Sequence, residues 1–265
     1  MQIQVSAKRR LLTATTTLTM FLMSTPLVAQ PWTKVPPPAI SRTADGKLDL
    51  SAPAPRLPNG KPDFSGVWGA PMGYLRDLGK DLKEPVPLQS SVKALYEERA
   101  AGLHWREESN GKCLPAGLPK ILLTPAPWRI VHTPERIFFI HEALNLWWQV
   151  FVDGREFVPS TDVTPTWHGY STGNWEGDTL VVESRGFNGK FWLDQLGKPS
   201  TEALHLIMRF RRKDFGHMDI QVTVDDPGAY TKPWTVSMEG FRLLPNDELM
   251  EMICLENEKD TRSDK

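Results

Sequence analysis

The sequence has almost no imbalance of charge: its 265 residues include 31 Lys and Arg against 32 Asp and Glu, for a formal net charge of −1. Proteins whose main partner is a nucleic acid usually carry a basic face, so this balance argues against such a partner. Several enzyme motifs are missing too, since there is no Gly-x-Ser-x-Gly, no glycine-rich phosphate loop and no dinucleotide-binding fingerprint. These absences argue against a common serine hydrolase and a Rossmann dehydrogenase.

Long hydrophobic runs are also absent, and no stretch after residue 30 approaches 18 consecutive apolar residues. The first residues have the order of an export signal: a basic group at 8–10, a mostly apolar run over 11–23, and Ala29 as a small residue for cleavage. We predict that 1–29 is a signal peptide, and that the mature protein is periplasmic or secreted with no stable membrane span. The alternative is an uncleaved anchor, but the apolar run is short for about 30 Å of hydrocarbon.

Cysteine is scarce, with Cys113 and Cys254 as the two examples. An even number of cysteines in an oxidising compartment favours a disulfide, which here would close a loop of about 140 residues. The six histidines show neither His-x-x-x-His nor His-x-His spacing, and two isolated cysteines supply too few ligands for a metal ion. We therefore predict a structural disulfide and neither a metal nor a cofactor; a metal site assembled from distant strands is the alternative.

Proline is abundant, with 23 residues, and it is concentrated in a lead-in over 30–65. Within this lead-in Arg42–Ser51 is echoed by Arg56–Ser65, and each copy contains a turn signal, Asp-Gly or Asn-Gly. We predict an extended arm over 30–65 on the surface of a single domain over 66–265. A helical insertion is predicted at about 88–102, because two serines can cap a helix there and its apolar positions share one face.

From residue 128 onward the chain consists of short runs rich in β-branched and aromatic residues, separated by turn signals. The runs expected to form strands are 128–132, 136–142, 146–153, 167–175, 179–185, 203–212, 217–225, 234–244 and 249–256. Sequential strands with short connections favour an antiparallel up-and-down barrel, which leaves no exposed strand edge. The predicted fold is mainly β and barrel-shaped, with a Greek-key sandwich as the alternative.

Two sets of residues resemble known proteins. Gly66-x-Trp68, at the start of the β region, resembles the Gly-x-Trp signature of lipocalin-like (calycin) barrels. This resemblance implies that Trp68 closes one end of a barrel and that an arginine, here Arg242, covers it. The Asp-Gly-Lys-x-Asp-x-Ser arm, Cys113-Leu-Pro-Ala-Gly-Leu-Pro and Asp225-Asp-Pro-x-Ala-Tyr-Thr-Lys-Pro-Trp resemble a family of exported proteins from soil bacteria. The second resemblance covers most of the chain and implies no particular activity.

Tryptophan is the most distinctive residue, with ten copies, many of them near strand ends and accompanied by polar side chains. A barrel interior lined with aromatic rings and a few converging polar groups is typical of a small-molecule pocket. We predict that the protein binds a small apolar or aromatic molecule there; the alternative is that these tryptophans only fill the core. The residues predicted to bind the ligand are Trp148, Arg155, Trp167, Tyr170, Trp192, Arg209 and Tyr230.

An acid–base enzyme is the alternative function: a cofactor-independent lyase, isomerase or hydratase that uses the same pocket. Its predicted catalytic residues are Glu142, Asp194 and His205, because burial raises the pKa of a carboxyl group and histidine titrates near neutrality. Neighbours on a strand face opposite ways, so only one of His141 and Glu142 can enter the barrel. We take the side of Phe138 as inward, which selects Glu142. A third hypothesis is an envelope scaffold whose proline-rich arm binds a partner.

Overall fold

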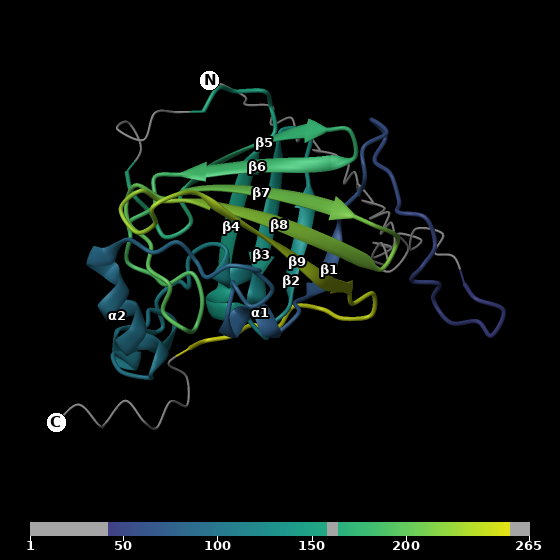
Figure 1. Cartoon of the computed structure of the whole chain (residues 1–265). Helices are drawn as coiled ribbons and strands as arrows, with labels where there is room; N and C mark the ends of the chain where they lie inside the picture. The colour runs from purple at the N-terminus through teal and green to yellow at the C-terminus, as the bar shows by residue number, and fades with distance from the viewer. Residues whose placement is uncertain (1–41, 158–163, 255–265) are drawn as a thin grey trace, which may run out of the picture. The chain divides into compact units, whose positions relative to one another are not determined.

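A closed barrel of nine strands dominates the computed structural model, which describes residues 42–157 and 164–254 (Figure 1). All of these residues fall within one unit, Ile40–Lys265. The predicted signal peptide, 1–29, lies outside the described residues.

Each strand pairs with the next one in the chain, and β9 pairs with β1 to close the barrel. The strands are β1 (Gly66–Gly69), β2 (Trp128–His132), β3 (Arg136–His141), β4 (Leu146–Phe151), β5 (Tyr170–Glu176), β6 (Thr179–Arg185), β7 (His205–Arg212), β8 (His217–Asp225) and β9 (Trp234–Leu243). Every pairing is antiparallel except that of β4 with β5, which is parallel. A parallel pair needs a long connection, and residues 152–169 supply it. The predicted barrel is therefore confirmed, with one parallel pair in an otherwise antiparallel wall.

The turn signals of the sequence set the strand bounds closely. β2, β6 and β8 occupy the residues predicted for them, and most of the other predicted strands differ by up to a few residues at their ends. The exception is 249–256, whose described part, 249–254, is not a strand. β9 already pairs with the short strand β1, so no free edge is left for a further strand on that side.

Alternate residues of each strand point into the barrel, because successive side chains on a strand face opposite sides. On β8, Ile220 and Val222 are fully buried, whereas Gln221 between them is exposed. The inward set is Trp68, Trp128, Ile130, Ile137, Phe139, Trp148, Val150, Leu180, Val182, Leu206, Met208, Phe210, Met218, Ile220, Val222, Val224, Val236, Met238 and Phe241. These apolar side chains form the core of the protein.

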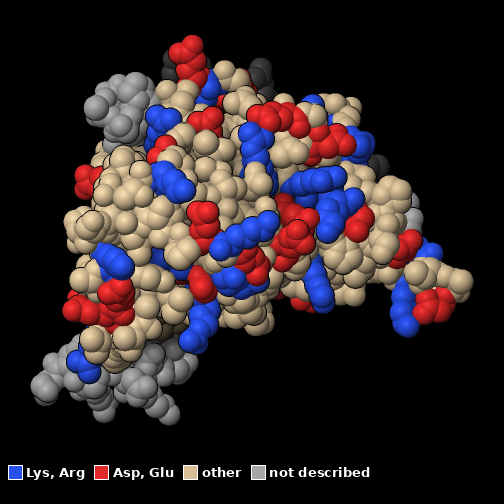
Figure 2. Space-filling view, in the orientation of Figure 1, with Lys and Arg blue, Asp and Glu red and all other residues tan. Residues whose placement is uncertain are grey.

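The outer face of β6–β9 is charged and mixed in sign. Figure 2 shows Lys and Arg interspersed with Asp and Glu over this face, with no large area of one sign. Neighbouring charges pair: Arg209 Nη1 lies 2.6 Å from Glu176 Oε2, and Lys213 Nζ lies 3.4 Å from Asp219 Oδ2. Exposed pairs of this kind add little stability. The alternation of apolar inward and charged outward side chains is what orients these strands.

One end of the barrel is closed by Trp68 and Arg212. Trp68 is fully buried, and the guanidinium of Arg212, at the end of β7, lies 5.1 Å from the centre of its ring. Arg212 also donates hydrogen bonds to three backbone carbonyl oxygens of neighbouring loops. The arginine expected at this place, Arg242, is instead exposed, because it alternates with the buried residues Phe241 and Leu243. The assignment of Arg242 to this position is therefore wrong, and Arg212 takes it.

The helical insertion contributes to the opposite end of the barrel. It contains α1 (Gly73–Arg76), α2 (Ser90–Ala100) and a buried single turn over Lys120–Leu123. The turn packs against the barrel, since the Trp128 indole N–H donates to the Leu122 carbonyl oxygen at 3.1 Å. The helix predicted within 88–102 is confirmed as α2, but none of its residues is buried. In Figure 1, α2 lies at the lower left, on the side where β6 ends.

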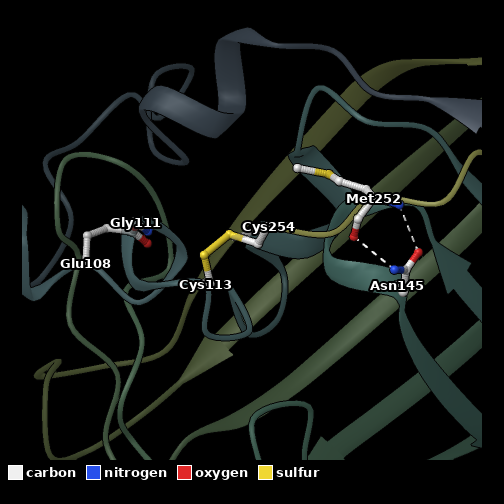
Figure 3. Close-up of a disulfide and its surroundings, with 6 residues drawn as sticks. All are labelled: Glu108, Gly111, Cys113, Asn145, Met252 and Cys254. Carbon is white, nitrogen blue, oxygen red and sulfur yellow. Dashed lines mark hydrogen bonds between the residues drawn. A yellow bond between two sulfur atoms is a disulfide. The ribbon is translucent and has the colours of Figure 1, made fainter. Parts of the chain in front are cut away.

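The C-terminal segment is fixed to the barrel by the predicted disulfide, which is confirmed. Cys113 and Cys254 are joined with their Cα atoms 5.7 Å apart and a sequence separation of 141 residues. Figure 3 shows the segment just before Cys254. Met252 N donates to Asn145 Oδ1 at 3.2 Å, and Asn145 Nδ2 donates to the Met252 carbonyl oxygen at 2.9 Å. The reciprocal pair holds the segment against the turn between β3 and β4, and the disulfide ties it to Cys113 in the helical insertion.

The described part of the arm, 42–65, is held on the barrel by specific contacts. Arg56 donates to both carboxylate oxygens of Asp178, at 2.9 and 2.7 Å. Nearer the start of the arm, the Phe215 N–H donates to the Ala52 carbonyl oxygen at 2.7 Å. The arm is thus part of the same unit as the barrel. Within the described part of the chain, no helix combines the length and apolar character that a bilayer crossing requires.

Candidate functional site

Aromatic rings gather inside the barrel on β2, β3, β4 and β7. The ring of Phe139 contacts those of Trp148 and Phe210, with centre-to-centre distances of 4.3 and 5.4 Å. Trp128 adds a further ring, 5.9 Å from Phe139. Phe139 and Trp148 meet because they are directly paired on neighbouring antiparallel strands, and paired residues share a face. We call Trp128, Phe139, Trp148 and Phe210 the aromatic cluster.

A short chain of hydrogen bonds leads from this cluster to the neighbouring strands β5 and β6. Trp148 Nε1 donates to Ser171 Oγ at 2.8 Å, and Ser171 Oγ lies 2.7 Å from Ser184 Oγ. Both serines are buried, and they are cross-strand partners on β5 and β6. An indole N–H only donates, so Ser171 accepts from Trp148 and its own hydroxyl proton is free to go to Ser184. The chain fixes the orientation of the Trp148 ring.

Two histidines have buried ring nitrogens without partners at the end of the barrel where β3 finishes. His141, the last residue of β3, is 1% exposed, and neither its Nδ1 nor its Nε2 has a hydrogen-bond partner among the described residues. Its ring centre lies 6.1 Å from that of Trp128. His168 lies close enough in space to affect the pKa of His141, and its Nε2 is likewise buried without a partner among the described residues. A buried polar atom without a partner costs about 1–3 kcal/mol, so this place favours a guest that can form hydrogen bonds.

Both imidazoles are neutral at neutral pH. Burial, with a smaller contribution from the nearby His168, lowers the pKa of His141 from 6.5 to about 3. Burial lowers the pKa of His168 from 6.5 to about 4. A neutral imidazole has one N–H donor and one nitrogen acceptor. The site therefore offers hydrogen bonds without charge, and burying an ion there would be costly.

The prediction of which β3 side chains point inward is wrong, because the inward positions are shifted by one residue. Phe139 and His141 are buried, whereas Ile140 between them is 38% exposed. Glu142 consequently lies on the outer side, where its Oε2 accepts a hydrogen bond from the Met250 N–H at 2.8 Å. Residues 137–140 are all apolar, so their alternation carries no signal about which face is inward. The residue that enters the barrel is His141 and not Glu142.

The other two predicted catalytic residues lie elsewhere. Asp194, in the loop between β6 and β7, is fully buried and accepts a hydrogen bond from Lys198 Nζ at 2.8 Å. His205 lies on the outer side of β7, with its Nε2 3.1 Å from Glu183 Oε2, and burial lowers its pKa. The three side chains predicted to act together face different surroundings. The structure does not assemble Glu142, Asp194 and His205 into one acid–base pocket.

The residues predicted to bind a ligand are also dispersed. Trp148 belongs to the aromatic cluster, and Trp167 is partly buried against the core. Outside the barrel, Arg155 Nη1 donates to the Tyr170 hydroxyl oxygen at 3.1 Å. The remaining predicted residues make separate contacts: Trp192 with Arg99, Arg209 with Glu176, and Tyr230 with the Pro199 carbonyl oxygen. A single pocket that contains all of the predicted residues is not what the structure shows.

The sequence by itself did not single out His141, His168, Ser171 or Ser184. A usable signal exists for Ser184: on β6 it alternates with Glu183, and a charged neighbour on the outer face places the serine inside. No such signal exists for His141, because the run before it is uniformly apolar.

Apolar side chains occupy the barrel interior, and two hollows lined by described residues lie outside its wall. One of about 650 Å³ is formed mainly by the chain between α1 and α2, and one of about 500 Å³ lies beside Tyr74 and Thr235. Neither of these two hollows is lined by His141 or His168. Within residues 42–157 and 164–254, no group of three or more His, Cys, Asp or Glu is placed to hold a metal ion.

Comparison with protein-family models, with curated proteins and with solved structures finds no match for this chain. The resemblances to lipocalin-like barrels and to exported soil-bacterial proteins therefore stay predictions, and the function is inferred from the geometry of the site.

Proposed function

We propose that this is an exported protein that binds a small, neutral molecule at the end of its barrel, beside His141 and His168. The ligand has an apolar or aromatic body and one hydroxyl or carbonyl group. The observation that carries this proposal is the set of three buried imidazole nitrogens that have no partner, next to the aromatic cluster. The disulfide supports export, because such bonds persist in oxidising compartments.

The chemistry of the ligand follows from the charge state of the two histidines. With pKa values of about 3 and about 4, both imidazoles are uncharged at pH 7 and cannot neutralise an anion. A hydroxyl group can donate to one imidazole nitrogen and accept from another, which satisfies atoms that are otherwise buried without partners. The ring of Trp128 offers an apolar surface to the rest of the molecule.

The low pKa values of His141 and His168 also favour binding over acid–base catalysis. A general base works best when its pKa is close to the working pH. At pH 7 His141 and His168 hold protons too weakly for this role. The predicted lyase, isomerase or hydratase also loses its three residues, since Glu142 is turned outward, Asp194 is held by Lys198, and His205 lies on the outer side of β7.

A matched series of three probes tests the proposal: 4-ethylphenol, ethylbenzene and 4-ethylbenzoate, titrated by tryptophan fluorescence and calorimetry at pH 7. We expect the phenol to bind about two- to tenfold tighter than ethylbenzene, because one neutral hydrogen bond contributes about 0.5–1.5 kcal/mol. The benzoate should not bind measurably. Failure of all three to bind, or preference for the benzoate, would overturn the proposal.

The variant His141→Phe assigns the binding to this site. It keeps a ring of similar size but removes both nitrogens, so the preference for the phenol over ethylbenzene should disappear. The matched control is His205→Phe, which changes a histidine on the outer face and should bind like the unmodified protein. Unchanged phenol binding by His141→Phe, in a variant that remains folded by circular dichroism, would exclude this site.

A further inference from the structure

A second site lies outside the barrel, in the hollow of about 650 Å³ between the segment 77–88, α2 and Lys198. This volume is within the range of small-molecule sites, about 300–1,000 Å³. One wall is apolar and includes Leu82, Val86 and the ring of Tyr96. Asp77 and Lys198 line the same hollow, so it combines an apolar wall with charged groups.

The charged groups form a trio with an excess of negative charge. Lys198 Nζ lies 2.6 Å from Asp77 Oδ1 and 2.8 Å from Asp194 Oδ2, and its side chain is only 2% exposed. Burial by itself lowers the pKa of Lys198. The negative charge of Asp194 and the hydrogen bonds to Asp194 and Asp77 outweigh burial, so the pKa lies above its usual value. Lys198 thus stays charged, and two carboxylates around one ammonium group leave one negative charge uncompensated.

That charge is presented to the hollow by Asp77. The Asp194 side chain is fully buried, whereas that of Asp77 is 34% exposed. Asp77 Oδ1 accepts hydrogen bonds from Lys198 Nζ and from the Gly79 N–H, at 2.6 and 2.9 Å. Its other oxygen, Oδ2, receives no hydrogen bond from the described residues. The hollow therefore contains one open carboxylate oxygen beside an apolar wall.

The charges at the rim largely cancel one another. Lys93 lies 3.9 Å from Glu97, and Glu84 lies 3.9 Å from Lys232. Lys83 is exposed at the rim, where water and salt screen its charge. The sign of the preferred ligand is consequently set by the trio and not by the rim.

We propose that this hollow binds a small organic ammonium ion with an apolar body. The ammonium group donates to Asp77 Oδ2, and the body lies against Leu82, Val86 and the Tyr96 ring. A charge-assisted hydrogen bond to a carboxylate is roughly twice as strong as a neutral one, so the cation is preferred over an alcohol of the same shape. This site is separate from the barrel interior and does not depend on the function proposed there.

The test compares benzylammonium, benzyl alcohol and benzoate by ligand-observed NMR and calorimetry at low salt. We expect benzylammonium to bind at least about tenfold tighter than benzyl alcohol, and benzoate not to bind. Raising the salt to about 0.3 M should weaken only the binding of the cation. Equal affinity for the cation and the alcohol would overturn the proposal, and so would binding that salt does not weaken.

Two variants locate the site. Asp77→Asn removes the charge and should weaken benzylammonium binding at least about tenfold. Val86→Phe keeps the trio but fills the hollow, and it should abolish binding even if Asp77→Asn does not fold. The controls are Glu84→Gln at the rim and His141→Phe in the barrel, both of which should bind benzylammonium like the unmodified protein. Unchanged binding by Val86→Phe would refute the location.

Discussion

Lowering the pH from 7 to 5 should destabilise this protein through its buried, neutral histidines. An unperturbed histidine has a pKa near 6.5, whereas in the folded state the pKa is about 3 for His141 and about 4 for His168. Between pH 7 and 5 the unfolded chain therefore binds protons at these positions that the folded chain does not bind. Stability rises with pH wherever the unfolded state binds more protons, so it must fall as the solution is acidified through this window.

The size of the effect follows from the two pKa values. A histidine that titrates near 6.5 when unfolded and stays neutral when folded loses about 2 kcal/mol of stability between pH 7 and 5. His141 and His168 together should therefore account for about 4 kcal/mol of the loss. The carboxyl groups titrate mainly below this window, which keeps their contribution small.

Urea unfolding followed by tryptophan fluorescence at the two pH values measures this loss. His141→Phe should lose about 2 kcal/mol less than the unmodified protein over the same interval, because it retains only one of the two groups. The difference between the two proteins cancels the contribution of every other titrating group. Equal losses in the two proteins would refute the reasoning that His141 is buried in its neutral form.

Three further predictions concern the contacts that hold the fold. Cys113→Ser should lower the free energy of unfolding by up to about 5 kcal/mol, given the separation of 141 residues, and dithiothreitol should destabilise only the unmodified protein. In urea unfolding, Arg212→Met should lower the free energy of unfolding by about 3 kcal/mol, and Arg242→Met should lower it by about 0.5 kcal/mol or less. Similar losses in the two variants would contradict the assignment of Arg212 to the barrel end. Asp194→Asn should lower the free energy of unfolding by about 1–3 kcal/mol in thermal melts, because Lys198 keeps Asp77 but loses its fully buried carboxylate partner.

The sequence was informative wherever a local rule decides the structure. Turn signals such as Asp153-Gly154 and Glu176-Gly177-Asp178 end strands by their own backbone preferences, so the strand bounds could be predicted. The disulfide was predictable because the export signal predicted from the sequence and an even number of cysteines leave few alternatives. Helix α2 was predicted in the correct place, but its burial was not, since its environment depends on distant parts of the chain.

The candidate site was much less predictable, because it depends on which face of each strand turns inward. On β3 the run before His141 is apolar at every position, so both faces satisfy the local pattern. The choice is made by pairing: Phe139 faces Trp148 across the strands, and this pairing carries His141 inward and Glu142 outward. A shift of one residue exchanges the two faces of a strand, and a shift of this kind produced the error in the predicted site.

The linear order of residues by itself determined that the chain forms short strands, where most of them begin and end, and which two cysteines join. The strands depend on residues that are neighbours in sequence, and the disulfide is determined because the chain has only two cysteines. Tertiary structure decided that Arg212 lies over Trp68, that the imidazole of His141 enters the core, and that Asp77, Asp194 and Lys198 form one trio. Each of these depends on contacts between residues far apart in the chain, which form only when the barrel closes and the loops cover its end.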